Sequence, residues 1–182
     1  TTVFHTAAGR EVRDGGGISP DKEVKSEKFP NILFYLVNDN LIFDYATDYC
    51  LKHPSIVSVE EFKVTDEDYN EFKEKVKKAD FKYDRQSEKV LKNLKEVAEF
   101  EGYMDDASEE FKALENKLKH NLDRDLDHFA KDIKLLIAQE IIKRYYYQAG
   151  AIKEQLKSDD DVEEALKILN DRPEYQKLLA GK

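Results

Sequence analysis

Serine, lysine, histidine and cysteine side chains can support hydrolytic chemistry, but this sequence does not space them for it. Nucleophilic catalysis needs a serine or cysteine held against a base, with donors nearby that stabilise an oxyanion. Ser87, Ser108 and Ser158 fall at expected helix starts, where capping favours serine. Ser26 lies beside lysines, but in a charged linker without a glycine-lined oxyanion site. We therefore predict no catalytic residue in this chain.

One aspartate-rich stretch begins like a calcium loop. Asp123, Asp125 and Asp127 are spaced like the first ligands of such a loop. The loop also needs glycine at its sixth position and glutamate at its twelfth, and these positions hold His128 and Lys134. We expect a solvated helix face there instead.

The histidines and the cysteine do not form a zinc site either. His120 and His128 are about 12 Å apart along a helix, whereas zinc–nitrogen bonds are about 2 Å long. We expect both of these, like His5 and His53, to be surface or half-buried side chains. The single cysteine, Cys50, excludes an intramolecular disulfide and a cysteine-based zinc site, and its aromatic neighbours favour a small buried hydrophobe. We predict no metal site and no cofactor.

The glycine-rich segment near the start does not match a phosphate-binding loop. A Walker loop has four residues between its glycines and then Lys-Ser or Lys-Thr, but five residues separate Gly9 from Gly15 and no such lysine follows. The dinucleotide fingerprint fails as well, because no helix-opening pattern comes next. We expect a glycine-rich turn and no cofactor-binding residue.

Three consecutive tyrosines, at positions 145 to 147, are a candidate cluster for stacking on a ligand. Consecutive helical residues point about 100° apart, so the three rings cannot share one face. Tyr145 matches the apolar stripe of its helix, and Tyr146 and Tyr147 flank it. The pattern therefore favours core or interface packing.

The composition limits the partners. The chain has 182 residues, is 40% hydrophobic and 38% charged, and carries a formal net charge of −9. Such an acidic surface repels nucleic acid and anionic lipid. The most apolar segment, residues 29–50, is broken by Asn and Asp side chains, so we expect no membrane span. No signal peptide is visible, and a start without Met inside a β-prone run leads us to expect a piece of a larger protein.

The pattern of apolar residues predicts helices after a short β-prone start. TTVFHT and GREVR are the β-prone runs, and KEVK is a further extended candidate. Residues 31–52 are apolar nearly all round, as in a buried helix, and residues 53–64 are expected to be extended. Thr65 and Asp68 have capping-box spacing at the start of the next helix.

The second half of the chain is predicted to be helical throughout. We expect a helix over 85–101 that Gly102 ends, another from about Asp106, and the strongest over 125–148, closed by Gly150. A further helix opens at Ser158, with a capping box to Asp161, and a short one lies near 173–180. The fold class is mainly α, a multi-helix bundle preceded by a short β-hairpin.

The opening stretch FHTAAGREVRDGGGISPD resembles the segment of C-terminal processing peptidases (tail-specific serine proteases) that follows their catalytic Ser and Lys. The matching residues are Thr6, Gly9, Arg10, Gly16, Gly17, Ile18, Pro20 and Asp21. Residues 62–77, 122–148 and 165–169 resemble the helical C-terminal region of Bacteroidetes-type members of that family.

This resemblance implies the C-terminal portion of an endopeptidase that uses a Ser nucleophile and a Lys general base. Residues 1–27 would be the final strands of the peptidase core, and 28–182 an all-α domain that shapes substrate access or assembly. The catalytic Ser and Lys of the family precede the matching motif, so none is assigned to a position here. The resemblance also implies polypeptide substrates, bound through peptidase and PDZ domains outside this chain, and a location in the periplasm or cell envelope. Self-association is left open.

Two other hypotheses remain. In the first, the chain is an acidic helical interaction module with no peptidase parent, whose strands are either disordered or paired with the sheet edge of a partner. Alternatively it is an intact small enzyme, which the missing catalytic residues disfavour. The gene upstream of Thr1 discriminates between them, since the peptidase hypothesis requires a PDZ-like region and a glycine-flanked Ser there.

Overall fold

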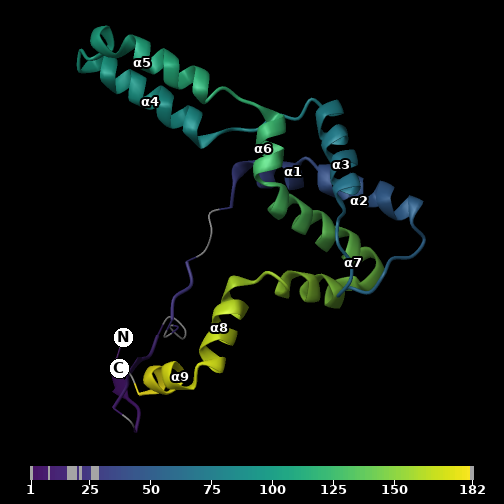
Figure 1. The fold of residues 1–182 in the computed structure, drawn as a ribbon. Coiled ribbons are helices and arrows are strands. Elements are labelled where there is room, and N and C mark those ends of the chain that lie inside the picture. Colours follow the sequence, from purple (N-terminus) through teal and green to yellow (C-terminus); the bar gives the residue numbers. More distant parts are fainter. Residues whose placement is uncertain (1, 8, 16–19, 21, 26–28, 181–182) are drawn as a thin grey trace. The chain divides into compact units, whose positions relative to one another are not determined.

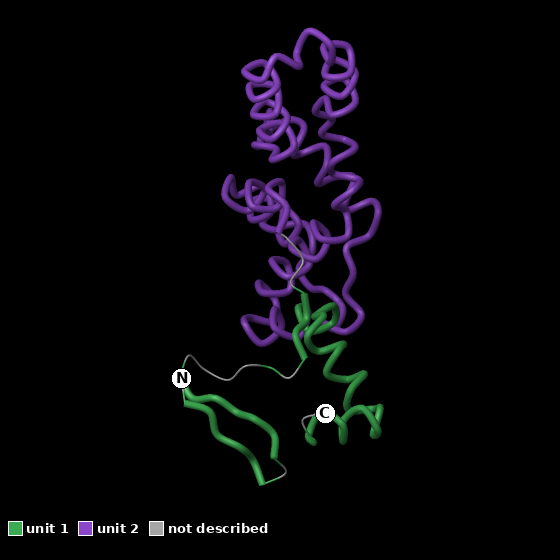
Figure 2. The backbone as a smooth tube through the Cα atoms, turned by 90° about the vertical axis from the view of Figure 1, so that its left-hand side faces the viewer, with its two compact units in different colours: residues 1–27, 155–182 green, residues 28–154 purple. Residues whose placement is uncertain are grey.

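The computed structural model describes residues 2–7, 9–15, 20, 22–25 and 29–180. Contacts between residues divide the chain into two compact units (Figure 2). One comprises residues 28–154, and the other comprises residues 1–27 and 155–182.

The prediction of a mainly helical chain with an N-terminal hairpin is confirmed (Figure 1). The helices in the described part are α1 (Asn31–Asn38), α2 (Leu41–Lys52), α3 (Asp66–Lys78), α4 (Gln86–Phe100), α5 (Met104–Lys117), α6 (Leu122–His128), α7 (Ala130–Leu156), α8 (Asp160–Asn170) and α9 (Arg172–Leu179).

The hairpin pairs β1 (Val3–His5) with β2 (Glu11–Arg13) in antiparallel register, with Phe4 opposite Val12. Gly9 lies in the connection with φ +81°, a conformation that glycine adopts without strain. The described residues of the KEVK segment form no strand. Ser19, Ser26, Gly16, Gly17, Ile18 and Asp21, on which several sequence expectations rest, lie outside the described residues.

The helix expected over residues 31–52 is two helices. Asn40 has φ 59°, in the left-handed region, and lies between α1 and α2. Asparagine tolerates this conformation better than most residues, so the Asn-Asp-Asn run allows the chain to turn while both helices keep their apolar faces inward. Residues 53–64, expected to be extended, form turns and irregular backbone with no strand.

Helix α3 begins with the predicted capping box. The backbone N–H of Asp68 donates to the hydroxyl of Thr65 at 3.1 Å, and the N–H of Thr65 donates to the Asp68 carboxylate at 2.9 Å. Two donors that the helix leaves unpaired are thereby satisfied. The cap fixes the start of the helix that carries Tyr69, Phe72 and Val76 into the core.

The main core lies in residues 28–154 and is built by α1, α2, α3, α6 and α7, with side chains from the 53–64 loop and the 81–85 segment. Its fully buried larger side chains are Phe72, Ile32, Leu36, Leu126, Ile133, Ile137, Ile141, Ile142 and Val76. These residues come from segments far apart in the sequence, so this core holds the unit together.

Helices α4 and α5 form an antiparallel hairpin with a small core of its own (Figure 1). Leu91, Ala98 and Phe111 are its buried residues, separate from the main core. Gly102, with φ +80°, follows the end of α4 as predicted, and α5 begins at Met104 rather than near Asp106.

The helix expected over residues 125–148 is interrupted, and Gly150 does not close it. Phe129 separates α6 from α7. Helix α7 then continues beyond Gly150 to Leu156, but it is kinked at Tyr147, where φ is 56° and ψ −160°. Gly150 is buried in α7, and a Cβ there would overlap the Cβ of Tyr146. Glycine at this position serves close packing rather than termination.

The cap of α8 is also displaced from the predicted residue. Asp159, not Ser158, is the N-cap, and its side chain accepts from the N–H of Val162 at 3.1 Å. Aspartate at this position also interacts favourably with the helix dipole, which explains why it is used in place of the serine. Asp171 caps α9 in the same way.

Candidate functional site

Some of the hollows on the described surface of residues 28–154 are lined largely by polar side chains. The first lies between α2 and α3, has a volume of about 680 Å³, and includes Tyr45, Tyr49, Asn70, Lys75 and Lys78 in its wall. The second, of about 660 Å³, runs along α4 and α5. The third, of about 270 Å³, lies between α1, the start of α4 and α6.

The α2–α3 groove has an aromatic wall and charged rims that are joined by ion pairs. Lys75 contacts Asp48 at 2.5 Å, and Lys52 contacts Glu71 at 3.0 Å. The hydroxyl of Tyr45 donates to the carbonyl of Asp68 at 2.7 Å, and burial raises the pKa of this phenol well above its ordinary value. A neutral, hydrogen-bonded phenol does not act as a base, so this groove is suited to binding.

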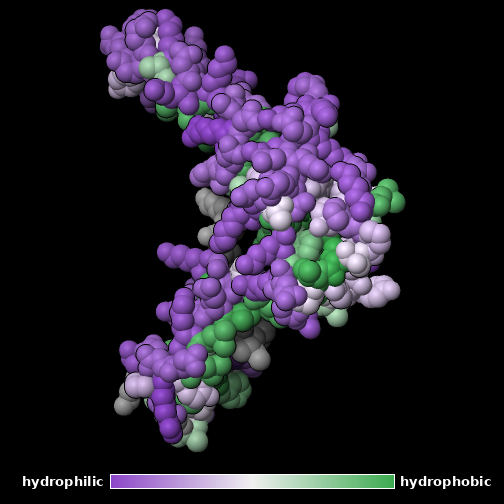
Figure 3. Space-filling model, turned by 45° about the vertical axis from the view of Figure 1, so that its right-hand side comes forward, coloured by the Kyte–Doolittle hydropathy of each residue, from purple (hydrophilic) through white to green (hydrophobic). Residues whose placement is uncertain are grey.

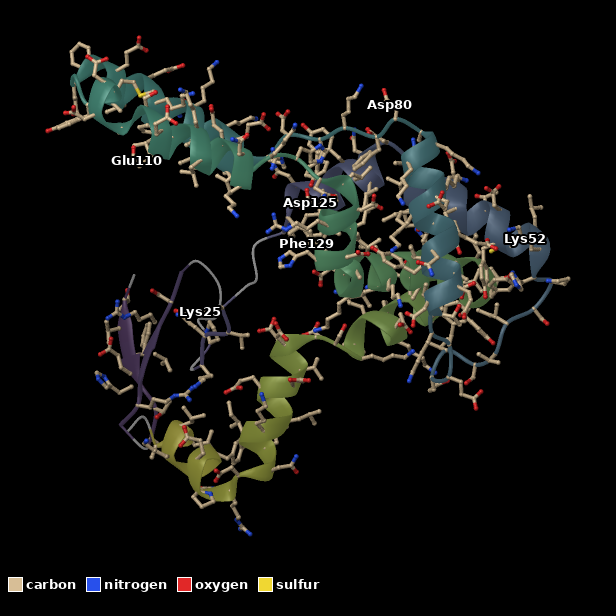
Figure 4. The ribbon with its side chains drawn as sticks, turned by 45° about the horizontal axis from the view of Figure 1, so that its top comes forward. Lys25, Lys52, Asp80, Glu110, Asp125 and Phe129 are labelled. Carbon is tan, nitrogen blue, oxygen red and sulfur yellow. The ribbon has the colours of Figure 1, made fainter. Side chains whose placement is uncertain are left out.

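The third hollow adjoins a polar cluster centred on Asp125, which Figure 4 labels on α6. The hydroxyl of Tyr83 donates to Asp125 Oδ2 at 2.5 Å, and His120 Nε2 lies 3.7 Å from the same oxygen. Burial, followed by the hydrogen bond to Asp125, raises the pKa of Tyr83. The cluster fixes the 81–85 segment against α6, which is a structural role.

Asp123 and Asp127 of the calcium-like stretch are exposed on helix α6, as we expected, but both are also ion-paired. Asp123 contacts Lys77 at 2.6 Å and Asp127 contacts Lys73 at 2.9 Å, so both carboxylates connect α6 to α3. The intervening Asp125 is bonded to Tyr83, as described above. The three aspartates therefore join α6 to α3 and to the 81–85 segment. Helical periodicity alone does not reveal these contacts.

The four histidines are dispersed over the fold. His5 lies exposed in β1, and His53 stacks on Tyr49 with ring centroids 4.1 Å apart. His128 is exposed and packs its ring edge against Phe129 at 4.6 Å. In the described residues, no three His, Cys, Asp or Glu side chains are placed to hold a metal ion.

The serines at the predicted helix starts do not cap their helices. Ser87 is the second residue of α4, whose first turn has no side-chain cap, and Ser108 lies inside α5. Ser58, in the 53–64 loop, donates its hydroxyl to the Glu61 carboxylate at 3.1 Å. Within the described residues Ser58 has no hydrogen bond to a lysine or histidine, so it is not arranged for nucleophilic attack.

The tyrosine cluster packs onto the 53–57 segment. The hydroxyl of Tyr145 donates to the carbonyl of His53, and that of Tyr146 donates to Val57 at 3.0 Å. Tyr147 is 78% exposed. Cys50 is half-buried, and burial together with a hydrogen bond to Cys50 raises the pKa of Tyr145 to about 12.

Arg144 is a structural residue that the sequence reasoning missed. Its guanidinium lies over the ring of Phe43, 4.6 Å from the centroid, and donates to the carbonyl of Phe43 at 3.0 Å. It also contacts Glu140 at 2.7 Å, one turn earlier. The spacing of Glu140 and Arg144 was the available signal, but it could not indicate that the arginine also ties α7 to α2.

One comparison with known proteins identifies the family of the helical part. Searches of curated proteins and of solved structures gave no match. No helix in the part of the chain that the structure describes has the length and apolar character needed to cross a membrane. Residues 32–169 match the model of the family described as "Probable PDZ-protease, C-terminal helical domain", which confirms the resemblance drawn from the sequence. Because this match covers well over half of the chain, the protein belongs to the family of C-terminal helical domains of probable PDZ-proteases.

Proposed function

We propose that this chain is the C-terminal, non-catalytic portion of a serine endopeptidase that cleaves polypeptides by a Ser-Lys mechanism. The family match over residues 32–169 is the observation that carries the proposal. The catalytic Ser and Lys belong to a peptidase region that precedes Thr1 in the parent protein, and the hairpin belongs to the edge of that region. The parent works in the periplasm or cell envelope.

In this proposal the helical domain guides the polypeptide substrate to the peptidase and takes no part in bond cleavage. Its main core is closed by buried aliphatic and aromatic residues, so residues 28–154 supply a stable body beside the peptidase. The α2–α3 groove combines the half-buried ring of Tyr49 with side chains of both charges. Such a surface contacts extended polypeptide through apolar and polar groups without demanding one sequence, which suits the guidance of an unfolded substrate.

The first experiment tests the assignment of catalysis. The purified chain should show no labelling by a fluorophosphonate probe and no hydrolysis of an unfolded protein such as reduced casein. The gene product expressed from its native start should be labelled at a single serine, and replacement of that serine by Ala should abolish both labelling and hydrolysis. If the whole gene product is not labelled, the serine-peptidase proposal is wrong.

The second experiment tests the groove in the whole gene product. Asn70→Ala/Lys78→Ala removes one exposed amide and one exposed lysine from the groove. Lys143→Ala/Gln148→Ala removes the same two kinds of exposed side chain from α7 and is the matched control. The groove variant should lower kcat/KM for casein severalfold through KM, while labelling of the serine by the small probe stays unchanged. Equal kinetics for both variants would contradict the access role and leave the catalytic assignment intact.

A further inference from the structure

The free end of the α4–α5 hairpin, residues 96–110, carries most of the net charge of the chain. It contains seven acidic residues and no Lys, Arg or His, so it contributes −7 of the total of −9. The acidic residues are Glu96, Glu99, Glu101, Asp105, Asp106, Glu109 and Glu110. Figure 4 labels Glu110 on α5, and all of residues 96–110 are described. We call this segment the hairpin end.

Two aromatic side chains stand out of the same segment. Phe100, the last residue of α4, is 93% exposed, and Tyr103, just before α5, is 62% exposed. Neither belongs to the small core of the hairpin, whose buried residues are Leu91, Ala98 and Phe111. Large exposed aromatics at a loop are typical anchors of protein interfaces.

The stability of the helices does not explain the acidic residues near the end of α4. A helix C-terminus carries partial negative charge and is stabilised by basic residues, but the last turn of α4 has none, and it contains Glu99 and is followed by Glu101 at the C-cap. Asp105 and Asp106 do suit the first turn of α5. The charge at the end of α4 therefore opposes folding locally, which is expected where function sets the sequence.

Lysines neutralise only a small part of this charge. Glu109 contacts Lys112 at 2.8 Å, and Glu96 lies 4.0 Å from Lys92. Within the described residues, the other five carboxylates of the hairpin end have no basic partner. Their negative potential therefore extends into solvent around Phe100.

We propose that the hairpin end docks onto a protein partner that presents an apolar pocket surrounded by lysine and arginine. Phe100 fills the pocket and Tyr103 contacts its edge, while the carboxylates face the basic rim and steer the approach. The negative charge of the hairpin end favours a basic protein partner, because it repels both anionic lipid and the hairpin end of a second copy. This docking is separate from substrate access through the α2–α3 groove.

The test uses three synthetic peptides of equal length that carry a fluorophore, titrated with the purified chain. One is an amphipathic helix of Lys and Leu, one is its Glu and Leu counterpart, and one is oligolysine. The Lys/Leu peptide should bind at least about tenfold more tightly than the other two, because it offers both an apolar face and a basic rim. Its affinity should fall as salt rises.

Two variants separate the apolar and the charged contributions. Phe100→Ala/Tyr103→Ala should weaken binding of the Lys/Leu peptide by about tenfold or more, as expected for interface anchors. Glu99→Gln/Glu101→Gln should weaken it and reduce its salt dependence. Asp160→Asn/Asp161→Asn, in the acidic first turn of α8, is the matched control and should bind like the parent chain. All of the substituted side chains are outside the buried core, and circular dichroism checks that the variants fold.

The remaining outcomes overturn the proposal. Equal binding of oligolysine and the Lys/Leu peptide, unaffected by Phe100→Ala/Tyr103→Ala, would show general charge attraction. A dimer in sedimentation that Phe100→Ala disrupts would identify a second copy as the occupant. Binding to vesicles of neutral phosphatidylcholine that depends on Phe100 would identify a membrane.

Discussion

The hydroxyl of Tyr69 in α3 donates a buried 2.6 Å hydrogen bond to the backbone carbonyl of Leu126 in α6. Helix α6 ends at His128, so this carbonyl is among the last four of its helix and has no continuing turn to bond. Leu126 itself is 0% exposed, which leaves no water for the carbonyl. Tyr69 thus replaces the helical hydrogen bond that is lost where α6 and α7 separate.

Replacement of Tyr69 by Phe should reduce the free energy of unfolding by about 1–3 kcal/mol, because a buried carbonyl is left without a donor. Chemical denaturation followed by circular dichroism measures the change. Tyr103→Phe, at an exposed tyrosine whose hydroxyl has no hydrogen bond within the described residues, is the control and should change stability by less than about 0.5 kcal/mol. Equal effects of the two substitutions would show that the Tyr69 bond does not stabilise the fold.

The stability of the chain should decrease in alkali. Burial raises the pKa of Tyr45, Tyr69 and Tyr83 above the value of about 10 in an unfolded chain. The folded state therefore holds these protons more tightly, and the resulting stability is complete below about pH 10 and is lost as the pH rises further. Urea unfolding between about pH 8 and pH 11 should show a loss that begins near pH 10. Tyr69→Phe/Tyr83→Phe should make the loss shallower, and a pH-independent stability of the parent chain would contradict this account.

Thr65→Ala should destabilise the chain by about 1 kcal/mol, since the first turn of α3 loses its capping box. Ser87→Ala is the informative comparison. Ser87 lies in the first turn of α4 without capping it, so its replacement should leave the midpoint of thermal unfolding unchanged or slightly raised. If Ser87→Ala cost as much as Thr65→Ala, the assignment of the caps would be wrong.

The relative stability of glycine and alanine at position 147 tests whether α7 is kinked there, because a kink and a regular helix predict opposite orders. Its φ of 56° and ψ of −160° are accessible to glycine but strained for other residues. Tyr147→Gly should therefore be more stable than Tyr147→Ala by about 1 kcal/mol. In a regular helix alanine would be favoured over glycine by about the same amount. Thermal unfolding of the two variants decides between these outcomes.

The α4–α5 hairpin should unfold separately from the main core. Phe111→Ala removes the largest side chain of the small cluster and should increase amide hydrogen exchange in residues 86–117. Protection in α3 and α7 should stay close to that of the parent chain. Ile137→Ala, at a fully buried position of the main core, should instead lower protection in α1, α2, α3, α6 and α7 and leave residues 86–117 protected. Loss of protection in both regions after Phe111→Ala would show one cooperative core.

Local signals in the sequence predicted the helices and part of their ends. The capping box at Thr65 and the glycine after α4 are short-range patterns whose chemistry is contained in a few residues. The breaks at Asn40, Phe129 and Tyr147 were not predicted, because the apolar stripe continues across each of them. Tertiary contacts accompany the breaks at Phe129 and Tyr147. Tyr69 bonds to Leu126, and Tyr145 and Tyr146 bond to the 53–57 segment, so residues far apart in the sequence are joined.

The candidate sites were less predictable than the helices. The sequence shows the Glu140–Arg144 spacing and the aspartates of α6, but their partners Phe43, Lys73 and Lys77 become neighbours only after folding. The acidic and aromatic composition of residues 96–110 is visible in the sequence. What the structure adds is that Phe100 stays outside the small core, since helical periodicity does not say which side of a turn is exposed. In Figure 3 the visible face is mainly hydrophilic, with hydrophobic residues confined to limited patches.

The two ends of the α4–α5 hairpin are joined where they meet the rest of unit 28–154. The guanidinium of Arg85, just before α4, donates at 2.6 Å to the carbonyl of Leu118, just after α5. The attachment is thus independent of how long the two helices are. Insertion of one heptad in each helix would lengthen the hairpin by about 10 Å without disturbing the main core. The Arg85–Leu118 hydrogen bond therefore separates the reach of the hairpin end from the packing of the main core.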